Sequence, residues 1–151
     1  MRVLFVLTLL TTLILPSGQA LASPSIDISA EDLRKQAVQG NPWAQHNLGV
    51  LYDNGRGVPQ DYATARQWYE KAAARGNPWA QHNLGVLYDN GRGVPQDYVK
   101  AYMWFDLAAA QLTGSGKKLA VENQDEIAAR MTPAQIAEAQ KLARKWTPKM
   151  P

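Results

Sequence analysis

Two neighbouring stretches alternate apolar and polar residues with the period of an α-helix. Stepping a helical wheel by about 100° per residue places the apolar residues of each stretch on one side. In the first stretch these are Ala44, Leu48, Leu51 and Tyr52, and in the second Tyr62, Ala65, Trp68, Tyr69, Ala72 and Ala73. Asn41 and Asp61 are suited to cap the two helices, and Gly55 can end the first in a left-handed conformation. The pattern predicts a helical hairpin that cannot bury its apolar sides alone.

This hairpin occurs twice. The sequence of Gly40–Tyr62 returns unchanged as Gly76–Tyr98, 36 residues later. A fixed period of this length is typical of stacked repeats, in which each unit buries the apolar face of its neighbour. We therefore predict an all-α solenoid with repeats at 40–75 and 76–111.

Further helices flank the repeats. Ser29 is expected to cap a short N-terminal helix, 29–39, whose apolar side holds Leu33, Ala37 and Val38. A linker is expected at Leu112–Gly116, followed by two helices within 117–146, Lys117–Met131 and Pro133–Trp146. Thr132 and Gln135 have the spacing of a capping box for the last helix. A solenoid needs such end units to cover its outermost helices.

The outer face of the second hairpin helix changes character between the repeats. Arg66, Gln67 and Lys71 of the first repeat are replaced in the second by apolar or aromatic residues: Tyr102, Met103 and Leu107. Burying such side chains is favourable by roughly 1.5–3 kcal/mol each. We expect the C-terminal helix pair to cover them.

The repeated residues also resemble a known family. The string A-Q-x-N-L-G-x-x-Y-x-x-G-x-G-V-x-x-D-Y-x-x-A-x-x-W-Y/F-x-x-A-A over Gly40–Gln111 is similar to the Sel-one-like repeat (SLR), a relative of the tetratricopeptide repeat. The resemblance implies a right-handed α/α superhelix used for protein–protein recognition, and it implies no reaction. Some secreted members staple each repeat with a disulfide, which this chain cannot do because it has no cysteine.

The N-terminus has the features of a cleaved signal peptide. Arg2 precedes the apolar run Val3–Leu15, and Ala20-Leu21-Ala22 supplies a small-x-small cleavage site. We expect residues 1–22 to be removed between Ala22 and Ser23, which leaves a periplasmic or secreted domain, 23–151, without a membrane anchor. Losing Arg2 lowers the formal charge from +3 to +2, which does not suggest a nucleic-acid partner.

Catalytic chemistry finds little support in the residues. The two histidines, His46 and His82, occupy equivalent positions in the repeats, where the wheel places them on the exposed surface. Helices of neighbouring repeats pack about 8–10 Å apart, which is too far for a shared zinc unless the side chains converge. Some relatives carry a β-lactamase label, which would come to this chain only through the resemblance. We expect no enzyme activity, metal or cofactor; the alternative is a hydrolase acting on the cell wall or on β-lactams.

The strongest candidate for a binding site is a stripe on the first helix of each repeat. In the tetratricopeptide architecture that helix lines the concave groove, where an asparagine can hold a peptide backbone by donating and accepting at once. The candidate residues are His46, Asn47, Val50 and Asp53 with their equivalents His82, Asn83, Val86 and Asp89. The same asparagines could instead bond to neighbouring helices, and Trp43 and Trp79 favour packing between repeats. The predicted function is an exported adaptor or regulator that binds a protein or peptide; a structural module that self-associates through its apolar end is a further alternative.

Overall fold

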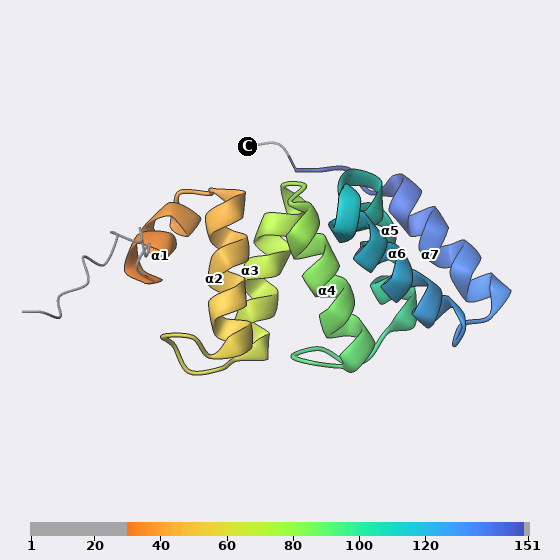
Figure 1. Ribbon diagram of the computed structural model, residues 1–151, viewed down its shortest axis with the longest axis horizontal. Coiled ribbons are helices and arrows are strands. Elements are labelled where there is room, and N and C mark those ends of the chain that lie inside the picture. The colour runs from red at the N-terminus through yellow and green to blue at the C-terminus, as the bar shows by residue number, and fades with distance from the viewer. Residues whose placement is uncertain (1–29, 150–151) are drawn as a thin grey trace, which may run out of the picture.

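The structure is a computed structural model that describes residues 30–149. Within this range the chain forms seven helices and no strand. They are α1 (Ala30–Val38), α2 (Pro42–Asn54), α3 (Tyr62–Ala74), α4 (Pro78–Asn90), α5 (Tyr98–Gln111), α6 (Gly114–Ala128) and α7 (Pro133–Lys145). The helices follow one another along the long axis of the molecule (Figure 1). The expected signal peptide and Ser29 lie outside the described residues.

The two hairpins form as the repeat predicts. Asn41 accepts hydrogen bonds from the backbone N–H groups of Trp43 and Ala44 and so caps α2. Gly55 ends that helix in the left-handed region at φ 64°, which glycine adopts without steric cost. Asp61 caps α3 in the same way as Asn41 caps α2. Identical sequence therefore gives α4 and the start of α5 the same bounds 36 residues later.

The core is a row of clusters between successive helices. One cluster joins α1 to α2, the next joins α3 to α4, and a third joins α5 to α6 and α7. Alanines supply many of the contacts, which lets the helix backbones approach closely. Each unit is stabilised mainly by its neighbours, as expected of a solenoid.

The C-terminal helix pair covers α5. Tyr102 is only 8% exposed, and Gln140 of α7 donates to its hydroxyl at 3.4 Å. Met103 and Leu107 are half-buried. Thr132 and Gln135 form the predicted capping box at the start of α7. The expected cover is confirmed for Tyr102, which shares a core cluster with Ile127 of α6 and Ala139 of α7.

Two local expectations are wrong. The segment Leu112–Gly116 is not a linker throughout, because α6 begins at Gly114 and its added turn brings Gly116 against Trp79. A Cβ atom on Gly116 would lie 3.0 Å from that indole ring, so the close approach needs glycine. Val38 does not share the buried side of α1 but is 74% exposed, since it lies about 100° around the helix from buried Ala37.

Candidate binding surface

The predicted stripe lies on the first helix of each unit, and the structure extends it into a third. We call the surface that carries Asn47 of α2, Asn83 of α4 and Asn123 of α6 the first-helix face. Asn123 donates from Nδ2 to Nε2 of His82 at 3.0 Å, just as Asn83 donates to Nε2 of His46 at 3.3 Å. Asn123 therefore takes the place of the repeat asparagine in the C-terminal unit.

These side chains form a continuous chain of hydrogen bonds, the His–Asn ladder. With the proton on Nδ1, His46 donates to Asn47 Oδ1 at 3.1 Å and His82 donates to Asn83 Oδ1 at 3.3 Å. Each Nε2 accepts from the asparagine of the next unit. The ladder thus runs across three units and uses both nitrogens of each imidazole.

The histidines are not the exposed residues that the wheel indicated. His82 is only 6% exposed and His46 is half-buried, because the next unit packs over each ring. The His46 ring also lies 5.9 Å from the ring of Tyr69, and the His82 ring 5.3 Å from that of Phe105, measured between centroids. Burial lowers the pKa of both imidazoles and favours the neutral form that the ladder needs. Neither ring offers a free nitrogen for a metal or for proton transfer.

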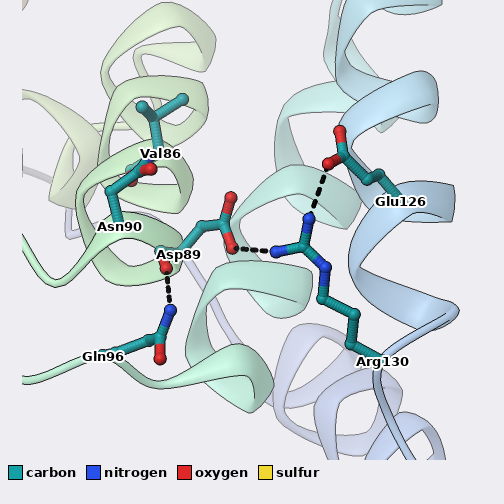
Figure 2. Close-up of polar contacts among 6 residues, drawn as sticks. All are labelled: Val86, Asp89, Asn90, Gln96, Glu126 and Arg130. Carbon is teal, nitrogen blue, oxygen red and sulfur yellow. Dashed lines mark hydrogen bonds and ion pairs between the residues drawn. The ribbon is translucent and has the colours of Figure 1, made fainter.

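The two candidate aspartates differ although their surrounding sequence is identical. Asp53 accepts from the Tyr69 hydroxyl at 3.0 Å, and burial together with the nearby Asp53 raises the pKa of that tyrosine. The second repeat has Phe105 in place of Tyr69, and Asp89 pairs instead with Arg130 at 3.6 Å. Figure 2 shows Arg130 between Asp89 and Glu126. Both aspartates serve internal contacts.

The remaining candidates, Val50 and Val86, also contribute to packing within the fold. Val50 and Val86 are half-buried against the core clusters. The neighbouring Asn54 and Asn90 bond to the Val50 and Val86 carbonyls at 2.9 Å.

One end of the first-helix face stays open. Asn47 is exposed, and no hydrogen bond to its Nδ2 is found among residues 30–149. Trp43, one turn earlier on α2, is 54% exposed, whereas its equivalent Trp79 packs against α5 and α6. The packing expectation is therefore confirmed for Trp79 and wrong for Trp43. Within residues 30–149, no counterpart of the added turn of α6 lies over Trp43, because α4 begins only at Pro78.

Comparison with known proteins decides the family. The Sel1 repeat model matches residues 44–77 and 80–111. The chain is 43% identical to a Sel1 repeat protein from Oxalobacter formigenes, with a TM-score of 0.56 over 61% of this chain and 69% of that one. The chain belongs to the Sel1 repeat family. No curated protein shows significant similarity to it.

A second solved Sel1-type structure is similar over a longer part of the chain. It is a protective antigen present in uropathogenic Escherichia coli strains that displays an SLR fold, with 36% identity and a TM-score of 0.73. The alignment covers 78% of this chain but only 24% of the antigen, so this protein spans about a quarter of that relative's length. Sel1 repeats generally mediate protein–protein interactions and are typically non-catalytic scaffolds.

Pockets, metal clusters and membrane-spanning helices are absent from the described part of the Sel1 repeat domain. Among residues 30–149 no pocket is found, and no three His, Asp or Glu side chains lie close enough to share a metal ion. None of the described helices has the length and hydropathy needed to cross a bilayer. The first-helix face is therefore the surface on which the functional proposal rests.

Proposed function

We propose that this Sel1 repeat protein is exported and acts as an adaptor or regulator that binds an extended segment of another protein at Trp43 and Asn47. The observation that carries the proposal is the exposure of both side chains, one turn apart on α2, while Trp79 and Asn83 are occupied in the next repeat.

The two side chains offer complementary contacts to a peptide. A tryptophan supplies a large apolar area at little cost in conformational entropy and is common among residues that dominate binding energy. The Oδ1 atom of Asn47 is occupied by His46, so its Nδ2 group is the donor available to a peptide carbonyl. The hydrogen bond from His46 to Asn47 Oδ1 orients the side-chain amide, so its Nδ2 donor is positioned before a peptide binds.

The test begins with the full chain expressed with its N-terminal segment. A partner captured from periplasmic extract would be titrated with the unaltered protein, with Trp43→Ala and with Val38→Ala. Trp43→Ala should weaken binding by at least about tenfold, since a buried aromatic anchor is worth roughly 2 kcal/mol or more. Val38 is also apolar and more exposed, which makes Val38→Ala the matched control. Equal affinities of the two variants would contradict the proposed site.

Export is tested independently of binding. The pattern of Met1–Ala22 supports cleavage before Ser23, so protein from the periplasmic fraction should have the mass of residues 23–151. An intact mass that retains Met1–Ala22 would contradict the predicted cleavage.

A further inference from the structure

The C-terminal tail after α7 runs back along the molecule to the junction of the two repeats. Figure 1 shows it passing from the end of α7 toward α3. The backbone N–H of Lys149 donates to the Ala74 carbonyl at 2.7 Å, and Trp146 meets Trp104 in an edge-to-face contact with centroids 6.3 Å apart. Between them, Pro148 lies where a Cβ atom on Gly76 would touch it, at 3.8 Å. The tail is an extended peptide docked on the solenoid.

The docking surface includes the Ala74 carbonyl, which has no hydrogen-bond partner within α3. The last carbonyls of a helix have no partner within it. At the end of α3, backbone N–H groups from residues 75–77 take the carbonyls of Ala72 and Ala73. The Ala74 carbonyl instead accepts a hydrogen bond from the Lys149 N–H of the tail. The backbone of any extended peptide docked there could supply the same donor.

The equivalent surface of the first repeat is covered by that repeat's own cations. Lys71 Nζ lies 4.3 Å above the centre of the Trp68 ring, and Trp68 is the equivalent of Trp104. The Arg75 guanidinium lies beside Gly40, the equivalent of Gly76. In the second repeat Lys71 is replaced by Leu107 and Arg75 by Gln111.

These two replacements leave the surface of the second repeat open to the C-terminal tail. Trp104 has no lysine above it, so the edge of Trp146 can approach its ring. The tail segment from Arg144 to Lys149 carries three cations, and the positions equivalent to Lys71 and Arg75 hold the uncharged Leu107 and Gln111, which do not repel it.

From these observations we propose that Trp104, the Ala74 carbonyl and Gly76 form a second peptide-binding site, separate from Trp43 and Asn47. Its ligand class is an extended, basic segment of another protein with a tryptophan and a proline two residues later. The C-terminal tail is the resident ligand, and a partner segment of the same chemistry displaces it. Such a segment loses little entropy on binding, because proline restricts it to extended conformations beforehand.

The probe is an N-acetylated nonapeptide with the sequence of residues 143–151. The host is the full chain with Trp146→Ala and Lys149→Pro, whose own tail lacks the indole and the N–H donor. Should Trp146→Ala unfold the chain in a thermal melt, Lys149→Pro alone serves as host, because it removes only one donor. Binding is followed by the NMR signals of the Trp104 indole N–H and the Gly76 amide.

Saturable shifts at Trp104 and Gly76 are expected in the host. The unaltered chain should bind at least about tenfold more weakly, because its tethered tail competes at an effective concentration in the millimolar range or above. Changing the tryptophan of the peptide to alanine, or its lysine at the position of Lys149 to proline, should also weaken binding by at least about tenfold. A threonine-to-serine change at the position of Thr147 is the control and should not. Leu107→Lys in the host, which rebuilds the arrangement of Lys71 over Trp68, should reduce binding similarly.

Three results would overturn the site: no saturable shift in a folded host, equal affinity for host and unaltered chain, or shifts confined to the residues around Trp43 and Asn47. The last of these would leave the proposed function intact, whereas a failure of the Trp43→Ala test would leave this site intact.

Discussion

Tyr69 donates its hydroxyl to Asp53 at 3.0 Å, a bond that Phe105 cannot make to Asp89 one repeat later. The two aspartates thus occupy equivalent sequence positions but should contribute differently to the free energy of unfolding. In Asp53→Ala the fully buried Tyr69 would lose the acceptor for its hydroxyl, which costs about 1–3 kcal/mol. In Asp89→Ala, Arg130 is nearly half exposed and keeps Glu126 at 2.7 Å, so the loss should stay below about 1 kcal/mol. Urea denaturation of both variants measures the difference.

A control separates the hydroxyl from other effects of the aspartate. In a Tyr69→Phe background no hydroxyl remains to be left unpaired. Asp53→Ala should then cost no more than Asp89→Ala does in the unaltered chain. If the cost of Asp53→Ala were the same in both backgrounds, the hydrogen bond would not be its cause.

The His–Asn ladder makes stability depend on pH. An imidazolium carries a proton on both nitrogens, and its Nε2–H would face the donor group of Asn83 or Asn123. Since burial lowers the pKa of His46 and His82 in the folded state, the unfolded state takes up protons first as the pH falls. The free energy of unfolding should be highest above the ordinary histidine pKa of about 6.5 and should decrease below it.

Urea denaturation at about pH 7.5, 6.5 and 5.5 tests this dependence. Aspartate and glutamate titrate near pH 4, and the chain has only these two histidines, so they dominate the window. The double variant His46→Gln, His82→Gln should show a nearly flat profile. An unchanged pH dependence in that variant would remove the ladder as its origin.

The C-terminal unit should be an integral part of the stability of the fold. Ile127 of α6 is 1% exposed and packs in one cluster with Phe105 and Ala139. Ile127→Ala should cost about 2–5 kcal/mol, the usual range for a buried isoleucine. Leu119→Ala on the same helix is the control, because Leu119 is 41% exposed and its change should stay within about 0.5 kcal/mol. Equal effects of the two variants would mean that α6 is not held by this cluster.

The sequence predicts most of the fold because the same cap, helix and turn signals occur in both repeats. Caps at Asn41 and Asp61, the stop at Gly55 and the apolar sides of α2 and α3 are local properties, and local properties can be derived from a wheel. The apolar change at Tyr102 even indicates where the C-terminal unit packs. The start of α6 at Gly114 was not predictable in this way, because two glycines at 114 and 116 favour a loop locally, and Gly116 packs against Trp79 only in the folded chain.

The candidate site was less predictable because burial in a solenoid depends on the neighbouring unit. A wheel for one helix places His82 on the polar side, but it cannot show that α6 lies over that side. Asn123 was recognisable as a polar residue on an apolar side of its helix, yet its pairing with His82 depends on a spacing of 40 residues between Asn83 and Asn123 in place of the repeat's 36. Trp43 and Trp79 are likewise identical in sequence and differ only in what lies next to them.

The asparagines of the first-helix face give the final test, because the structure assigns them different tasks. Asn83 is half-buried and bonds to both histidines, so Asn83→Ala breaks two rungs of the ladder. It should lower the free energy of unfolding by about 1–3 kcal/mol. Asn47 makes only the exposed bond to His46, so Asn47→Ala should stay within about 0.5 kcal/mol.

Binding should respond to the same two changes in a different way. Asn47→Ala removes the donor proposed for a peptide carbonyl and should weaken partner binding by about 1–3 kcal/mol with an unchanged melt. Titration of the partner alongside urea denaturation separates affinity from stability for each variant. If Asn47→Ala lowers stability and leaves affinity unchanged, Asn47 serves the fold alone, and Trp43 would then have to bind the partner without it.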